Sequence, residues 1–169
     1  STKPVSVLFV CLGNYCRSPM AEAVFAHMTA SNPLISKTDS CGTGAYHAGS
    51  YPDPRTQAIL QKNAITDYVH VARKVRPEDF IEFDWVMGMD SDNILDLQRV
   101  RQRATKLMEK EGKGEEGLAK LCLFGDFGRK DKRGRGEEVI DPYYGADNGF
   151  DIAFEQMGRF TKGFLEYLE

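Results

Sequence analysis

The chain has 169 residues, of which 41% are hydrophobic and 28% charged, and its formal net charge is −3. This length fits one domain over residues 1–169 with a full hydrophobic core, and the charge argues against nucleic acid or a membrane as the main partner. No apolar run approaches transmembrane length, no signal pattern opens the chain, and the four cysteines do not suggest a disulfide framework. We therefore expect a cytoplasmic chain with reduced thiols.

The first predicted elements are a strand over residues 5–10 and a helix that follows it closely. The strand sequence VSVLFV is short, apolar and β-branched, as buried strands are. Ser18 is the predicted N-cap of the helix, Pro19 suits its first position, and the Asn-Pro pair at 32–33 breaks it. Between the strand and the helix lies CLGNYCR, a loop of C-x5-R form over residues 11–17.

Predicted strands and helices then alternate along the rest of the chain. Further strands are expected over residues 37–41, 84–89 and 118–124. Further helices are expected after the caps Asp53 and Ser91, and a last helix spans residues 149–168. The apolar side chains of this last helix fall on one face, which predicts core packing: Phe150, Ala153, Phe154, Met157, Phe160, Phe164, Leu165 and Leu168.

This alternation predicts an α/β fold. Strands that are joined through helices give right-handed crossovers, and hence a small parallel sheet of about four strands with helices on both faces. Ligands of such sheets bind beyond the carboxyl ends of the strands, which is where the loop 11–17 would lie. Residues 109–117 and 129–138 are rich in Gly, Lys, Arg and Glu, and we expect them to be exposed loops.

The loop 11–17 has the features of an anion site. It runs from a strand end into a helix N-terminus, where backbone N–H groups and the helix dipole attract a negative charge and favour a thiolate at Cys11. Gly13 would let the backbone approach the anion with a positive φ, and Asn14 tolerates a left-handed turn. The planar fork of Arg17 suits two oxygens of a phosphate.

Two motifs together resemble the low-molecular-weight protein tyrosine phosphatase family: CLGNYCRS at residues 11–18 and DPYYG at residues 141–145. The likeness extends over essentially the whole chain, through Ser40, Gly42, the turn at 52–55, His70 to Arg73, and Met89-Asp90. Larger tyrosine phosphatases place a histidine before the cysteine, whereas Val10 stands there in this chain. The segment 99–138 looks longer than the usual connection of the family, so a long, partly exposed connection is expected there.

The resemblance implies a cofactor-free enzyme that hydrolyses phosphotyrosine and aryl phosphates through a cysteinyl-phosphate, with acid phosphatase activity as well. Residue chemistry gives the same roles: Cys11 is the nucleophile, Arg17 neutralises the phosphate oxygens, and Asp141 protonates the leaving oxygen and then activates water. The expected phosphate-binding loop consists of Leu12, Gly13, Asn14, Tyr15, Cys16 and Ser18. Ser18 has two candidate roles, as a helix cap and as a hydrogen-bond donor to the sulfur.

Tyrosines are the expected walls of the cleft, with Tyr143 and Tyr144 on one side and Tyr46 on the other. By family analogy, Tyr143 and Tyr144 are also candidate phosphorylation sites. The resemblance further implies that Ser40 and His70 hydrogen-bond around Asn14 and hold the loop in shape.

Cys16 is the expected redox partner of Cys11, because a thiol beside an oxidised cysteine can trap it as a disulfide.

No metal site is expected, since His27, His47 and His70 lack ligand spacing. The expected ligands are phosphotyrosine proteins or small aryl phosphates, with phosphate or vanadate as inhibitors, and the chain is expected to be a monomer.

Three other functions use a similar fold or loop. An arsenate reductase would need a relay of further thiols, and Cys41 and Cys122 are not an obvious relay. A phosphocysteine carrier of a sugar-transport system would not need an acid that expels a leaving group. A non-enzymatic phosphotyrosine-binding module would have no need of Cys11 and Asp141 together. Hydrolysis of an aryl phosphate separates the phosphatase from all three.

Overall fold

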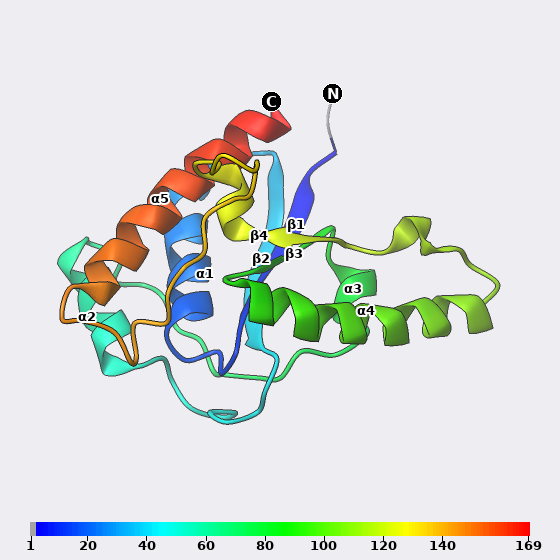
Figure 1. The fold of residues 1–169 in the computed structure, drawn as a ribbon, viewed down its shortest axis with the longest axis horizontal. Helices are drawn as coiled ribbons and strands as arrows, with labels where there is room; N and C mark the ends of the chain where they lie inside the picture. The colour runs from blue at the N-terminus through cyan, green and yellow to red at the C-terminus, as the bar shows by residue number, and fades with distance from the viewer. Residues whose placement is uncertain (1–2) are drawn as a thin grey trace.

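A four-stranded parallel sheet lies at the centre of the computed structural model, which describes residues 3–169 (Figure 1). The strand order is β2-β1-β3-β4, and every neighbouring pair is parallel. The strands are β1 (Val5–Cys11), β2 (Ile35–Gly42), β3 (Trp85–Gly88) and β4 (Lys120–Leu123). The predicted α/β class and the sheet of about four strands are thus confirmed.

Helices cover both faces of this sheet, as expected (Figure 1). One face carries α1 (Arg17–Met28), α2 (Pro54–Lys62) and α5 (Gly149–Leu168), and the other carries α3 (Asp79–Glu82) and α4 (Ser91–Lys110). Two short 3₁₀ helices flank β4, namely η1 (Glu115–Gly117) and η2 (Phe124–Phe127). No helix in the described residues has the length and apolar character needed to cross a bilayer.

β1 supplies the core on both sides. Because side chains alternate along a strand, Val7, Phe9 and Cys11 face α1 and α5, whereas Leu8 and Val10 face α3 and α4. All five residues are at most 3% exposed, which explains the continuous apolar run of a strand that is buried on both faces. The alternation places the thiol of Cys11 on the α1 side, at the carboxyl end of the sheet.

The predicted helix caps are only partly right. Asp53 caps α2, with its carboxylate accepting the Arg55 N–H at 2.7 Å. Ser18, however, is the second residue of α1, which begins at Arg17, so neither Ser18 nor Pro19 stands at the predicted position.

At α4 the cap is Asp90 rather than Ser91. Its carboxylate accepts the Asn93 N–H, and the Asn93 side chain accepts the Asp90 N–H in return. This capping box satisfies two N–H groups at the helix start, whereas a cap at Ser91 would satisfy one.

The segment 99–138, which was expected to be a long, partly exposed connection, contains helices and a strand. α4 continues to Lys110, and η1, β4 and η2 follow before residue 128. Residues 109–117 are exposed, as expected, but they are not all loop, because residues 109–110 end α4 and residues 115–117 form η1. Residues 129–138 form a loop that is held at its end by Glu137, whose carboxylate accepts the Arg129 N–H and is paired with Arg159 of α5.

Candidate active site

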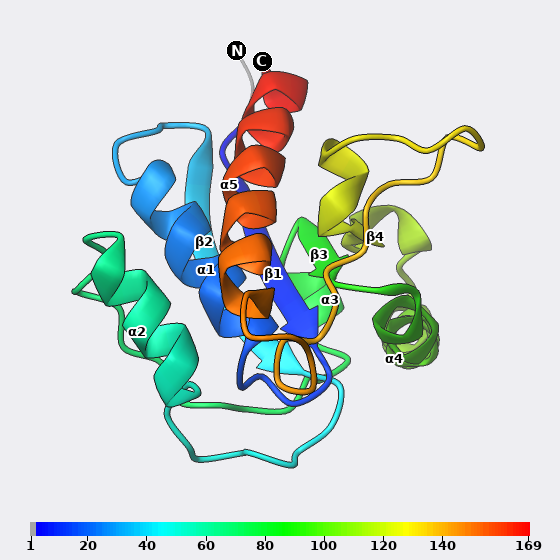
Figure 2. The same ribbon diagram turned by 60° about the vertical axis from the view of Figure 1, so that its left-hand side comes forward.

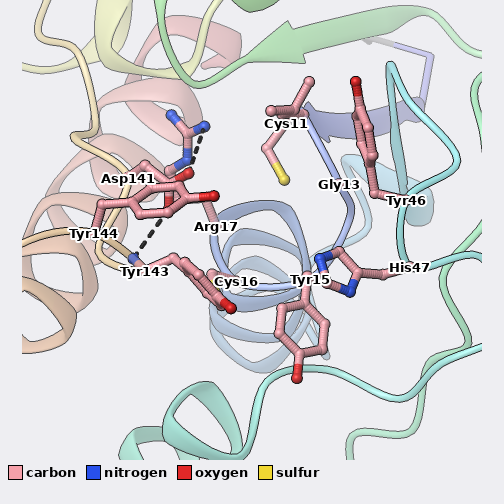
Figure 3. Close-up of a pocket in the computed structure, with 11 residues that line it drawn as sticks. Cys11, Gly13, Tyr15, Cys16, Arg17, Tyr46, His47, Asp141, Tyr143 and Tyr144 are labelled. Carbon is pink, nitrogen blue, oxygen red and sulfur yellow. Dashed lines mark hydrogen bonds and ion pairs between the residues drawn. The ribbon is translucent and has the colours of Figure 1, made fainter.

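The loop after β1 opens into a cleft of about 310 Å³ at the carboxyl end of the sheet. Figure 2 shows that the segments after β1, after β2 and before α5 meet at this end of the molecule. Figure 3 shows the Cys11 sulfur pointing into the cleft, with Arg17 and Asp141 to one side. The lining residues are Cys11, Leu12, Gly13, Tyr15, Cys16, Arg17, Tyr46, His47, Asp141, Tyr143 and Tyr144.

Two groups of Ser18 meet the sulfur of Cys11 at the floor of the cleft. The Ser18 backbone N–H donates to Cys11 Sγ at 3.4 Å, and Ser18 Oγ lies 3.1 Å from the same sulfur. Both contacts come from the first turn of α1, where the helix dipole favours a negative charge. The place of Ser18 inside the helix, rather than at its cap, is what turns these groups toward the thiol.

Asn14 carries the bend of the loop. It is a non-glycine residue with a positive φ, 53°, and it is 1% exposed. Its amide donates to Ser18 Oγ at 2.8 Å and to Ser40 Oγ at 3.0 Å, while Oδ1 accepts from the Arg73 N–H and lies 2.7 Å from His70 Nε2. Four partners therefore hold a backbone conformation that is unfavourable for most side chains.

A second group of polar side chains lies behind Asn14. Glu22 of α1 accepts hydrogen bonds from Ser40 Oγ and Tyr68 Oη at 2.7 and 2.8 Å. Burial raises the pKa of the Glu22 carboxyl to about 7, although these two hydrogen bonds act in the opposite direction. Burial also lowers the pKa of His70. Ser40 and His70 thus lie against Asn14 as the resemblance implied, in a network that also contains Glu22 and Tyr68.

Arg17 is fixed on one side and free on the other. Its Nη1 donates to Asp90 Oδ2 at 2.6 Å and to the Val139 carbonyl at 2.9 Å. Within residues 3–169, Nη2 makes no hydrogen bond, and it lies 3.8 Å from Asp141 Oδ2. The guanidinium is therefore positioned by the cap of α4 and keeps donors for an anion in the cleft.

Asp141 enters the cleft from the segment before α5. Val139 anchors this segment, because its N–H donates to the Met89 carbonyl at the end of β3. Asp141 Oδ1 accepts the Tyr143 N–H at 3.0 Å, which makes a local turn, and the Asp141 side chain is 32% exposed. This loop brings the Asp141 carboxylate and Arg17 together, although the two residues are 124 positions apart in the sequence.

The three predicted wall tyrosines surround the mouth of this cleft. Tyr46 and Tyr144 are 75% and 83% exposed, whereas Cys11 at the floor is 3% exposed. Tyr143 lies against Tyr144, with ring centroids 4.7 Å apart. The cleft is thus aromatic at its rim and charged at its floor.

Known proteins with the same sequence pattern confirm the resemblance. A sequence model of the low molecular weight phosphotyrosine protein phosphatase family matches residues 6–169. A relative of that name from Schizosaccharomyces pombe is 42% identical, over 98% of this chain and 97% of its own.

The chain belongs to the low molecular weight phosphotyrosine protein phosphatase family.

Solved structures agree with this assignment. A protein tyrosine phosphatase from Entamoeba histolytica has a TM-score of 0.77 at 31% identity and covers 97% of this chain and 96% of its own. A drosophila arginine phosphatase also has a TM-score of 0.77, at 30% identity, and covers 95% and 96% of the two chains. This phosphatase thus shares the fold of the family as well as its sequence, and it is a cysteine-dependent enzyme.

Two glycines at the phosphate loop, Gly13 and Gly42, are needed for close approach rather than for a positive φ. Gly13 does not use the positive φ that a glycine permits, but a Cβ there would lie 2.9 Å from the His47 ring. At Gly42 of β2 a Cβ would lie within 2.9 Å of the backbone of the loop, at Leu12, Gly13 and Asn14. His47 in turn stacks on Tyr15, with ring centroids 4.0 Å apart.

Cys16 lies beneath the loop, beside Asp53. Its side chain is 5% exposed, and Sγ donates to Asp53 Oδ2 at 3.6 Å. Burial, followed by the charges of Asp53 and Asp141, raises the pKa of the Cys16 thiol. Asp53 therefore has a role at the loop besides capping α2.

Sequence reasoning missed several residues of the site. Asp90 was noted only as part of the likeness, yet it caps α4 and binds Arg17. Glu22 and Tyr68 gave no local signal, since their partners lie 18 and 46 residues away in sequence. His47 was considered only as a metal ligand, whereas the structure places it against Tyr15.

Proposed function

We propose that this protein hydrolyses phosphotyrosine with Cys11 as nucleophile, Arg17 as phosphate-binding group and Asp141 as general acid and base. The observation that carries the proposal is the presence of these three side chains on one cleft with an aromatic rim. The Cys11 thiolate attacks phosphorus while protonated Asp141 gives its proton to the phenolic oxygen, leaving a cysteinyl-phosphate. Ionised Asp141 then takes a proton from water, which attacks phosphorus and releases Cys11.

The loop supplies charge stabilisation during both steps. Arg17 has Nη2 free to bind the equatorial oxygens, and the loop Leu12, Gly13, Asn14, Tyr15 and Cys16 offers its backbone N–H groups. Ser18 stabilises the leaving sulfur through its hydroxyl and its N–H. Ser40 and His70 do not line the cleft, and they act as positioning residues that hold Asn14.

The depth of the cleft favours phosphotyrosine over phosphoserine. A phosphate must reach Cys11 at the floor, past the exposed rings of Tyr46 and Tyr144. The phenyl ring of phosphotyrosine spans this depth and stacks on the walls, which adds about 0.5–1.5 kcal/mol. Phosphoserine would bring the peptide backbone against the rim.

The positions of the other thiols argue against an arsenate reductase relay. Cys41 lies in the core on the α3 and α4 face of the sheet, whereas Cys11 lies on the α1 face. Cys122 is in β4, which is separated from β1 by β3. Neither thiol is in position to pass electrons to Cys11.

The four cysteines are unpaired in the described residues, which fits a reducing, cytoplasmic location. The residues of the cleft all come from one chain, which fits a monomer.

The test is a comparison of matched peptides that carry phosphotyrosine, phosphoserine or phosphoarginine, the last because one structural neighbour is an arginine phosphatase. We expect kcat/KM to be highest for phosphotyrosine, p-nitrophenyl phosphate to be hydrolysed at acid pH, and phosphate and vanadate to inhibit. Cys11→Ser should abolish turnover and retain vanadate binding. Comparable kcat/KM on phosphotyrosine and phosphoserine would contradict the proposed selectivity, and turnover by Cys11→Ser would contradict the mechanism.

A further inference from the structure

An apolar groove lies against the segment of chain that carries Asp141. It has a volume of about 180 Å³ and lies between residues 138–146 and the start of α5. Figure 2 shows this segment folded beside the first turns of that helix. The apolar lining comes from Ile140 and Pro142 of the segment and from Ile152 and Ala153 of α5. The groove is thus a hollow separate from the cleft, with one wall from the segment and one from the helix.

The segment is a thin partition between this groove and the cleft. Ile140 and Pro142 line the groove. Asp141 and Tyr143, which alternate with them in the sequence, line the cleft instead. Packed backbone layers lie about 10 Å apart, and an extended peptide rises about 3.3 Å per residue. About three residues of an extended peptide therefore reach from one hollow to the other.

The groove has a buried floor and two exposed apolar walls. Pro142 and Ala153 are buried, whereas Ile140 is 80% exposed and Ile152 is 52% exposed. A single exposed isoleucine needs no explanation, but two of them on the two walls of one hollow form an apolar surface for a partner. A side chain that enters between them loses contact with water on both sides, which favours an apolar one.

The backbone of Ile140 is free for a partner as well. The N–H groups of Glu137 and Val139 donate to the carbonyls of Gly125 and Met89, so these residues tie the segment to the protein. Within residues 3–169, the N–H and the carbonyl of Ile140 between the two hollows make no hydrogen bond. An extended peptide can therefore bind this residue through its main chain while one of its side chains enters the groove.

The charges at the groove disfavour an acidic partner. Glu138 lines it, and Asp147 and Asp151 are exposed next to lining residues in the sequence. Lys62 lies 3.7 Å from Asp151 and offsets one of these three carboxylates. A carboxylate that entered the groove would meet like charges, whereas an apolar side chain would not.

We propose that the groove binds an apolar side chain of the substrate, about three residues from the phosphotyrosine, and that Ile140 and Ile152 determine this specificity. The inference rests on the proposed function, because a phosphotyrosine held in the cleft brings its own peptide against the partition. The second contact is then intramolecular, so a shallow groove is enough to add affinity. The occupant is therefore the substrate chain itself.

The test moves one leucine along the four positions on either side of phosphotyrosine in a peptide of Gly and Ser. Each kcat/KM is divided by the value on p-nitrophenyl phosphate, which has no flanking residues. We expect a rise of about tenfold with leucine about three residues from phosphotyrosine, and no rise with glutamate there.

The outcomes separate this inference from the proposed function. Equal values at all positions, or a rise only next to phosphotyrosine at the tyrosine rim, would overturn the inference and leave the function standing. No hydrolysis of any of the peptides would overturn both.

Ile152→Gln should remove the preference, because glutamine suits an exposed helix position but is not an apolar wall. Leu95→Gln is the matched control, since Leu95 is 56% exposed on α4, outside the groove. The ratio of kcat/KM for the leucine peptide to that for its glycine counterpart should fall to about one in Ile152→Gln and stay near tenfold in Leu95→Gln. An unchanged ratio in Ile152→Gln would overturn the inference.

A further measurement needs no change in the groove. In methyl spectra of the Cys11→Ser chain, the leucine phosphopeptide should shift the δ1 methyl signals of Ile140 and Ile152 and leave that of Ile81, an exposed residue of α3. If the leucine and glycine peptides give the same shifts at Ile140 and Ile152, the groove does not bind the leucine, and the proposal is wrong.

Discussion

Ser18 Oγ lies 3.1 Å from the sulfur of Cys11, inside the first turn of α1 rather than at its cap. The same oxygen accepts from Asn14 Nδ2 at 2.8 Å, so this hydroxyl is held in place by the residue that bends the loop. Its one proton can go to the Cys41 carbonyl, 3.2 Å from Oγ, or to the sulfur. The sulfur is the stronger acceptor when it becomes negative, that is, when the cysteinyl-phosphate breaks down.

We predict from this contact that Ser18→Ala slows the second chemical step. Loss of one hydrogen bond to a charged group is worth about 1.5–3 kcal/mol, which corresponds to a fall of about 10–100-fold in kcat. Rapid mixing with p-nitrophenyl phosphate should then show a burst of nitrophenol followed by slow turnover. An unchanged kcat without a burst would show that the hydroxyl only supports the loop.

Asp141→Ala should slow turnover by about 10²–10⁴-fold, the usual range for general acid catalysis. The loss should be larger for a phenol that leaves poorly than for p-nitrophenol, since a poor leaving group depends more on the proton. Asp147→Ala is the control, because Asp147 is an exposed carboxylate of the same segment outside the cleft. Equal losses on both esters would exclude Asp141 as the proton donor.

The sequence predicted the parts of the site that are local. Cys11 and Arg17 are six positions apart and stand at the two ends of a short loop between a strand and a helix. Their proximity therefore follows from the loop itself. Asn14 was expected to tolerate a left-handed turn, and its φ is 53°, because asparagine accepts this conformation more readily than most other residues.

What the sequence could not show depends on contacts between distant elements. Arg17 is positioned by Asp90 and the Val139 carbonyl, which are 73 and 122 residues away. Gly42 is required because the loop passes over β2, which no turn preference of that glycine reveals. The cap of α4 was misplaced because a sequence pattern does not say which of two neighbouring polar residues meets the first free N–H groups. The cap of α1 was misplaced because this helix begins at Arg17 and has no side-chain cap, with Cys16 at the cap position.

Oxidation should test whether Cys16 protects Cys11. Peroxide is expected to convert the Cys11 thiolate to sulfenic acid, and attack by the Cys16 sulfur would form a disulfide with release of water, which dithiothreitol reduces. Cys16→Ser should therefore recover a much smaller fraction of its own initial rate than the wild type. Cys122→Ser, which changes a thiol outside the cleft, should recover as the wild type does. Full recovery of Cys16→Ser without a Cys11–Cys16 disulfide in peptide maps would assign Cys16 to packing.

The last prediction concerns the ion pair that holds the end of the loop 129–138. Hydrogen bonds from Arg159 lower the pKa of the Glu137 carboxyl from its ordinary 4.5 to about 2. A carboxyl whose pKa is lower in the folded state contributes stability above its unfolded pKa and loses it as the pH falls through the folded one. The contribution should therefore be complete above about pH 5, fall progressively below that, and be gone only below about pH 2.

Arg159→Met should accordingly lower the free energy of unfolding by about 1–2 kcal/mol at pH 7, since the pair is bidentate and mostly buried. Urea unfolding at a series of pH values should show this difference shrinking from pH 4.5 downward. Arg135→Met is the matched control, because Arg135 pairs with Asp131 at an exposed turn and should change stability little at any pH. A deficit of Arg159→Met that is as large at pH 2 as at pH 7 would mean that the arginine acts through packing on Phe160 rather than through Glu137.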